Sequence, residues 1–144
     1  MVVTLSDAAR RYIALFEDET GATARDCLIF DDGDGDDRVV FLVKPGDMGK
    51  AIGEGGETVR AIEDQLGADV TLVEDADTAE AFVANALAPA AVYNVTVSED
   101  EETVAYAEVD SEDIGIAIGE DGRNIETAET LAKRHYDIDD IQLT

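Results

Sequence analysis

A ten-residue segment occurs twice in this chain, and this internal repeat constrains the fold more than any other feature. Residues 47–56 read DMGKAIGEGG and residues 113–122 read DIGIAIGEDG, so seven of the ten positions carry the same residue. The two copies start 66 residues apart in a chain of 144 residues. A period this long exceeds that of solenoid repeats and suits two small domains in tandem. We therefore expect two similar domains, residues 1–75 and residues 76–144.

The residues around the first copy alternate between helical and strand patterns. Apolar residues at helical spacing predict a first helix over 6–18, with Ser6 as its N-cap. The glycine segment is preceded by a short helix over 48–52 and followed by a helix that ends at Gly67. Runs of apolar and β-branched residues predict three strands, over 26–30, 38–43 and 68–74.

The second half repeats this order. A helix is predicted over 78–88, with Asp77 as its cap and Glu80 as the partner of that cap. Two further helices flank the second glycine segment, and three strands follow from the apolar pattern: helices over 111–118 and 123–136, and strands over 92–97, 103–109 and 138–143. Each half is therefore helix, strand, strand, helix, glycine loop, helix, strand, which predicts an α+β protein.

The glycine segments 53–56 (GEGG) and 119–122 (GEDG) each join two helices by a tight turn. Such a turn needs positive φ or close backbone approach, which glycine permits at little steric cost. The helix after each turn begins with unpaired amides, and amides at a helix N-terminus bind phosphate well. The apolar pairs Ile52/Val59 and Ile118/Ile125 are expected to pin each helix–turn–helix to its sheet.

The pattern Ile-Gly-x-x-Gly-x-x-(Val/Ile), at residues 52–59 and 118–125, resembles the GXXG loop of the KH domain, which holds about four nucleotides of single-stranded RNA. The order of elements is similar to the type II form. This resemblance implies two tandem type II KH domains, each a three-stranded sheet with helices packed on one face. Two such domains with no third resemble the archaeal NusA-like transcription termination/antitermination factors.

The resemblance implies that both loops bind single-stranded RNA and that the chain associates with RNA polymerase during elongation and termination. Each loop, the helix turns beside it and the basic residues near it would form the binding groove. The RNA-binding residues expected on this basis are Lys44, Lys50, Ile52, Gly53, Glu54, Gly55, Gly56, Arg60, Ile118, Gly119, Glu120, Asp121, Gly122 and Arg123.

The variable positions of both loops depart from the usual KH pattern, in which at least one is basic. Here they are Glu54 and Gly55 in the first loop, and Glu120 and Asp121 in the second. Carboxylates at these positions repel phosphate at ordinary salt. Three bases lie close to the first loop, whereas the second keeps only Arg123, so we expect the first loop to be the stronger RNA site.

The charge of the chain is extreme, with 35 acidic residues against 10 basic ones and a net charge of −25. Self-repulsion of this size destabilises a compact domain at low ionic strength. At 1 M salt the Debye length is about 3 Å, so neighbouring carboxylates hardly interact. The acids are spread over all the elements and are not gathered in one tail. This distribution predicts a cytoplasmic protein of a halophile and argues against the alternative, an acidic protein that binds basic partners. No apolar run has the length of a membrane span.

One acidic segment, DDGDGDD at 31–37, suggests a cation loop because Asp32, Asp34 and Asp36 alternate. An EF-hand needs glycine at the next position and glutamate at position twelve, where this chain has Asp37 and Val43. An acidic hairpin turn is therefore the favoured interpretation.

No residue pattern indicates catalysis, a metal site or a cofactor. His135 has no Cys/His cluster around it, no Walker-type lysine follows the glycines, and Cys27 lies in an apolar run that predicts a buried thiol. The aromatic residues are expected in the core, with Tyr106 as a candidate exposed platform for a base.

We expect an RNA-binding, monomeric transcription factor and not an enzyme. Two alternatives stay open: a KH-fold module that docks on RNA polymerase without binding RNA, and a KH factor of ribosome assembly or RNA processing.

Overall fold

The computed structural model describes residues 5–31 and 37–144, which form two compact units, 5–75 and 76–144. The first unit contains three helices, one 3₁₀ turn and three strands: α1 (Asp7–Thr20), β1 (Ala24–Asp31), β2 (Asp37–Val43), α2 (Met48–Ile52), η1 (Glu54–Gly56), α3 (Glu57–Leu66) and β3 (Asp69–Glu74). The second repeats this order: α4 (Ala79–Ala86), β4 (Val92–Glu99), β5 (Thr103–Val109), α5 (Ile114–Ile118), η2 (Glu120–Gly122), α6 (Arg123–Tyr136) and β6 (Asp140–Leu143). The predicted order of elements is confirmed in both halves.

The core of unit 5–75 forms between its three helices and one face of its sheet. Residues at alternate positions of a strand point to the same face, and Val39, Phe41 and Val43 of the central strand β2 are all buried against the helices. Phe16 of α1 stacks on Phe41 with ring centroids 4.4 Å apart. Burying side chains of this size contributes about 1.5–3 kcal/mol each.

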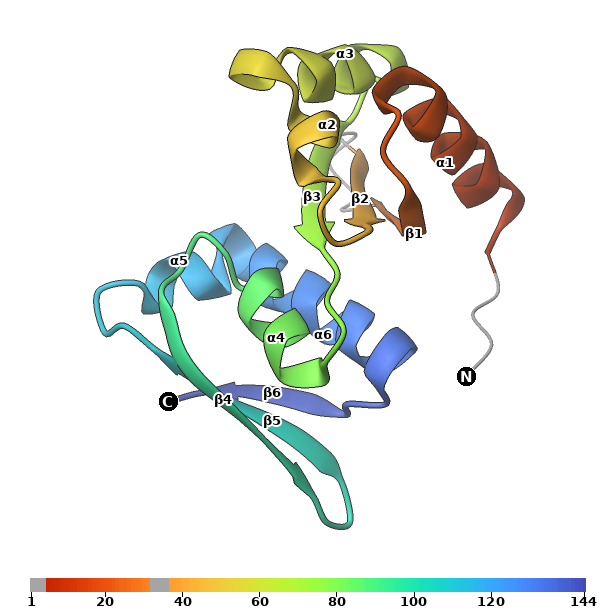
Figure 1. Cartoon of the computed structure of the whole chain (residues 1–144). Helices are drawn as coiled ribbons and strands as arrows, with labels where there is room; N and C mark the ends of the chain where they lie inside the picture. The colour runs from red at the N-terminus through yellow and green to blue at the C-terminus, as the bar shows by residue number, and fades with distance from the viewer. Residues whose placement is uncertain (1–4, 32–36) are drawn as a thin grey trace. The chain divides into compact units, whose positions relative to one another are not determined.

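Unit 76–144 packs in the same way. Ala105, Ala107 and Val109 of β5 are buried at alternate positions, and α4 and α6 lie on the same side of the sheet (Figure 1). Phe82 of α4 stacks on Tyr136 of α6 with centroids 4.8 Å apart. The predicted architecture, a three-stranded sheet with helices on one face, is therefore confirmed.

Both sheets combine one antiparallel and one parallel pairing. In the order β1-β2-β3, β1 and β2 are antiparallel and β2 and β3 are parallel; the order β4-β5-β6 repeats this arrangement. A parallel pair needs a crossover connection, usually helical. In each unit that crossover consists of the short helix, the glycine loop and the long helix, so the sheet fixes both ends of the segment that carries the loop.

Several helix ends differ from the sequence predictions: α1 ends at 20 rather than 18, and α5 starts at 114 rather than 111. The Ala9 amide donates to Ser6 Oγ at 3.1 Å, and Gly67 ends α3 in the left-handed region, as predicted. The predicted Asp77–Glu80 cap is wrong, because the Ala81 amide donates to Thr78 Oγ1 at 3.2 Å. Helix α4 accordingly starts at 79, and it ends at 86 rather than 88.

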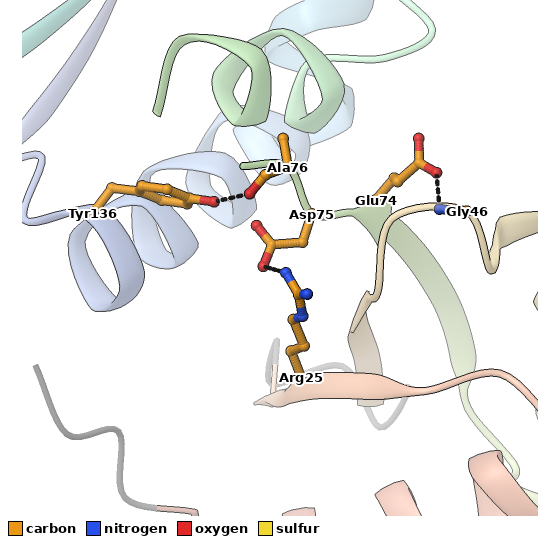
Figure 2. Close-up of polar contacts among 6 residues, drawn as sticks. All are labelled: Arg25, Gly46, Glu74, Asp75, Ala76 and Tyr136. Carbon is orange, nitrogen blue, oxygen red and sulfur yellow. Dashed lines mark hydrogen bonds and ion pairs between the residues drawn. The ribbon is translucent and has the colours of Figure 1, made fainter. Parts of the chain in front are cut away.

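The chain passes from one unit to the other between residues 75 and 76, and the residues on each side of this point form hydrogen bonds within their own unit (Figure 2). At the end of unit 5–75, Arg25 Nη1 donates to Asp75 Oδ2 at 2.9 Å and the Gly46 amide donates to Glu74 Oε2 at 3.1 Å. At the start of unit 76–144, the Tyr136 hydroxyl donates to the carbonyl of Ala76 at 2.7 Å. Since Asp75 and Ala76 are consecutive, no linker residue separates the units.

Candidate nucleic-acid interface

The first glycine loop places Gly53 where no other residue fits. Gly53 has φ 75° and ψ 173°, a backbone conformation that is essentially restricted to glycine. A Cβ atom there would lie 2.7 Å from Thr58 Cβ and 2.9 Å from the Thr58 amide nitrogen, and closer still to its hydroxyl. The prediction that the turn needs positive φ or close approach is confirmed, and Gly53 needs both.

The second loop has nearly the same backbone. Gly119 has φ 80° and ψ 172°, and a Cβ atom there would lie 2.8 Å from Asn124 Cβ. The loops differ one step later, where Gly55 (φ 62°) corresponds to Asp121 (φ 55°). Aspartate tolerates this left-handed conformation better than most residues do. The second loop therefore keeps its shape but carries a side chain where the first has only a hydrogen atom.

The helix that follows each loop starts at an uncapped glycine. Gly56 and Gly122 are the N-cap residues of α3 and α6, and glycine has no side chain with which to cap the first amides. The helix dipole adds partial positive charge at this end. The amides of Gly56 and Glu57 already donate to the carbonyls of Gly53 and Glu54, and the second loop has the same two bonds, so the helix dipole and the later amides of the first turn are what each loop offers an anion.

The structure brings one of the predicted basic residues directly onto the first loop. Arg60 Nη2 donates a hydrogen bond of 2.9 Å to the carbonyl oxygen of Gly55, and the Arg60 side chain is exposed. Lys50 is exposed in the last turn of α2, two residues before the loop's exposed Ile52. Lys44 lies before α2, at the helix end away from the loop. Arg60 and Lys50 are therefore the two cations placed beside this loop.

Val59 and Ile125 are half-buried, but the predicted role of Ile52 and Ile118 as pins to the sheet is wrong. The side chains of Ile52 and Ile118 are each 40% exposed, whereas Ala51 and Ala117, one position earlier, are fully buried. The short helices α2 and α5 pack through their alanines, and the isoleucines border the loops.

The aspartate that starts each repeat has a structural role that the sequence did not reveal. The Thr23 amide donates to Asp47 Oδ2 at 2.9 Å, and the Ala91 amide donates to Asp113 Oδ2 at 2.8 Å. In both units this bond joins the start of the short helix to the segment that leads into the first strand of the sheet. The repeated aspartate thus positions the loop-bearing helix.

The expectation that aromatic residues lie in the core fails at Tyr93, which is 65% exposed; Tyr106 is 39% exposed. The register of β4 against β5 shifts between Val92 and Asn94, and at this bulge the alternation of half-buried and exposed residues along β4 is broken, so that Tyr93 and Asn94 are both exposed. Its hydroxyl donates to Asp110 Oδ2, a bond that raises the pKa of Tyr93 and lowers the pKa of Asp110.

Cys27 is buried, as predicted, and burial raises the pKa of its thiol to about 12. Within residues 5–31 and 37–144, no group of three or more His, Cys, Asp and Glu side chains is arranged to hold a metal ion. The alternating Asp32, Asp34 and Asp36 lie outside the described residues. None of the helices in the described ranges has both the length and the apolar character that a bilayer span requires.

Comparison with known proteins identifies the fold of each half. A family model described as "KH domain" matches residues 10–79, and one described as "NusA-like second KH domain" matches residues 79–144. The solved crystal structure of APE1850 superimposes with a TM-score of 0.83 at 27% identity, covering 97% of this chain and 100% of that one.

Relatives of this chain carry the name "Probable transcription termination protein NusA". That of Halobacterium salinarum is 66% identical over 144 residues, the whole of both chains, and that of Halococcus morrhuae is 63% identical over 143 residues, or 99% of each. That of Methanocaldococcus jannaschii is 34% identical over 132 residues, 91% of this chain and 69% of that protein. The first two sources confirm the halophilic origin predicted from the acidic composition. The chain therefore belongs to the NusA family of transcription termination proteins and consists of two KH domains.

Proposed function

We propose that this chain is an RNA-binding transcription factor that clamps single-stranded nascent RNA at its GXXG loops, mainly the first, and acts with RNA polymerase in termination or antitermination. The observation that carries the proposal is the first loop itself. Its glycine-only backbone is followed by an uncapped helix start, and Arg60 is held on the loop by the Gly55 carbonyl at 2.9 Å.

Arg60 supplies the charge that the loop's own side chains lack. A guanidinium group has five N–H donors, and its bond to Gly55 fixes the group's place without neutralising it. Its planar fork matches the oxygens of a phosphate. Lys50 adds a second, more mobile cation on the preceding turn. A sugar–phosphate strand lying on the loop would meet backbone amides on one side and these cations on the other.

In high salt, the ionic contacts weaken and the hydrogen bonds and apolar contacts hold the RNA. In molar salt, where the Debye length is about 3 Å or less, the repulsion from Glu54 fades and so does long-range attraction. Direct hydrogen bonds and burial of bases against Ile52 are not screened in this way. The clamp would therefore retain RNA under conditions that abolish purely ionic binding, which falls log-linearly with salt.

The mechanism is stoichiometric binding, with no bond made or broken by the protein. Holding the RNA behind the polymerase would bias the choice between pausing, release and continued elongation. The protein would act as a monomer in the cytoplasm, where transcription takes place.

The test is fluorescence anisotropy with a short labelled single-stranded RNA in about 2–3 M KCl. In the first loop, Gly55→Asp places a carboxylate in space that is open in the structure, with no heavy atom within 4 Å of the added Cβ. Because Asp121 adopts the equivalent backbone in the second loop, the variant is expected to fold. The side chain would occupy the place of the RNA backbone, and affinity should fall by about tenfold, or ~1.4 kcal/mol.

The matched control is the reciprocal change, Asp121→Gly, which should leave the affinity of the first loop intact. Saturable binding lost in Gly55→Asp and kept in Asp121→Gly supports the clamp. Absence of binding to any RNA in the wild type would instead favour a KH module that contacts only protein.

A further inference from the structure

The two loops share a backbone but differ in the residues that surround them. Residues 66 positions apart occupy equivalent places in the two units, because the repeat and the order of elements coincide. Where the first unit has the bases Lys44, Lys50 and Arg60, the second has Asp110, Ile116 and Glu126. Close to its loop, the second unit gains one base, Arg123, in place of Glu57.

The second loop is bordered by exposed apolar side chains. Ile116 is 46% exposed and Ile118 40% exposed on the short helix α5. Tyr93, the exposed residue of the β4 bulge, hydrogen-bonds to Asp110, and the charge of Asp113 at the start of α5 is near enough to act on its hydroxyl. We call these residues the α5 patch: Tyr93, Asp110, Asp113, Ile116, Ile118 and Asp121.

Single-stranded RNA is a poor occupant for the α5 patch. The Asp121 side chain stands where the first loop leaves open space for a strand, and the two positions equivalent to Lys50 and Arg60 no longer carry a cation. The surface of another protein is a better occupant for the α5 patch. Exposed Tyr and Ile side chains bury well in a protein interface, aromatic residues are enriched there, and salt does not screen this contribution.

The negative charge around the apolar residues of the α5 patch indicates which kind of protein surface would bind there. The described surface of the α5 patch carries three aspartates, so a complementary surface presents an apolar pocket bordered by Lys and Arg side chains. A protein surface that guides RNA carries positive potential, because it has to lie beside phosphates. The part of RNA polymerase from which the transcript emerges is a surface of this kind.

We propose that the α5 patch docks on a basic, partly apolar surface of RNA polymerase beside the path of the nascent RNA, so that one KH unit holds the transcript and the other holds the enzyme. This inference rests on the proposed function, since it takes the polymerase as the partner and the first loop as the RNA clamp.

The test exchanges the residues at one pair of equivalent positions, both exposed. The variant Ile116→Lys gives the second unit the lysine of the first, and Lys50→Ile does the reverse; each unit already folds with the incoming residue at the equivalent place in the other. Binding of the full chain to purified RNA polymerase of a halophilic archaeon is measured by biolayer interferometry in about 2–3 M KCl, and RNA affinity is measured in parallel. The variant Ile116→Ser repeats the test without added charge, and circular dichroism reports folding.

We expect Ile116→Lys and Ile116→Ser to weaken polymerase binding by about tenfold, as truncation of a buried interface residue does, while RNA affinity does not fall. Lys50→Ile should lower RNA affinity and leave polymerase binding within about twofold of the wild type. The docking proposal is overturned if the wild type does not bind the polymerase, if both Ile116 variants bind it as the wild type does, or if Lys50→Ile weakens that binding equally. Loss of the RNA signal in all proteins, with the polymerase effect of Ile116 intact, would instead refute the RNA clamp alone.

Discussion

Replacing Gly53 by alanine tests whether the first loop is as constrained as its geometry indicates. The backbone of Gly53, at φ 75° and ψ 173°, costs about 1–3 kcal/mol for a residue with a side chain. The added Cβ would also lie 2.7 Å and 2.9 Å from the Cβ and amide nitrogen of Thr58. Neither atom is the flexible end of a side chain, so the first turn of α3 must shift, at a further ~1–3 kcal/mol. We expect Gly53→Ala to lower the free energy of unfolding of unit 5–75 by about 2–6 kcal/mol.

Two glycines of the same segment supply matched controls. Gly55 has φ 62° with no heavy atom within 4 Å of an added Cβ, so Gly55→Ala should cost only the left-handed backbone term of about 1–2 kcal/mol. Gly49 lies within α2, and an added Cβ would meet open space. Gly49→Ala should therefore be neutral or stabilising by up to ~1 kcal/mol, the difference in helix propensity.

Cys27 makes the measurement specific to the unit that carries the loop. It is the single cysteine of the chain and is buried in unit 5–75, so alkylation of its thiol as a function of urea, in high KCl, reports unfolding of that unit alone. The reasoning would be refuted if Gly53→Ala destabilised the unit no more than Gly55→Ala.

Three further predictions concern the packing of the two units. Ser6→Ala and Thr78→Ala each remove an N-cap bond and should each cost about 1 kcal/mol, but only Ser6→Ala should increase the alkylation of Cys27, because Thr78 caps a helix of the other unit. In the folded chain Cys27 should resist alkylation through neutral pH, since burial raises its pKa to about 12 and leaves almost no thiolate to react. The same shift predicts that stability falls as the pH rises above 9.0, the unperturbed pKa, toward 12, because the unfolded thiol ionises first; Cys27→Ser should flatten this part of a pH–stability curve measured by urea titration.

Most of the fold could be predicted from the internal repeat and from the hydrophobic periodicity of the sequence. Helix α6 occupies residues 123–136 as predicted, because its apolar spacing is long and uninterrupted and the glycine before it marks its start. Because the segment is duplicated, the helices and strands predicted in the second half could be compared with those predicted in the first. Residues 53–56 and 119–122 were recognisable as special because glycine is needed where the backbone turns and helices meet.

The errors arose where neighbouring residues compete for one role or where a strand is irregular. Asp77 and Thr78 are both good N-cap residues, and which of them caps α4 depends on where the chain leaves β3. The β4 bulge that exposes Tyr93 leaves no mark in the alternation of the sequence. The exposure of Ile52 and Ile118 follows from how closely α2 and α5 approach the sheet through Ala51 and Ala117, a distance that periodicity does not specify.

The most direct test of the RNA clamp is an NMR titration of the ¹⁵N-labelled chain with a short single-stranded RNA, in high KCl. The account predicts that the largest amide shifts fall on residues 53–58 and the Arg60 side chain, with much smaller changes at 119–124. Shifts confined to the second loop, or absent from both loops at saturating RNA, would contradict it.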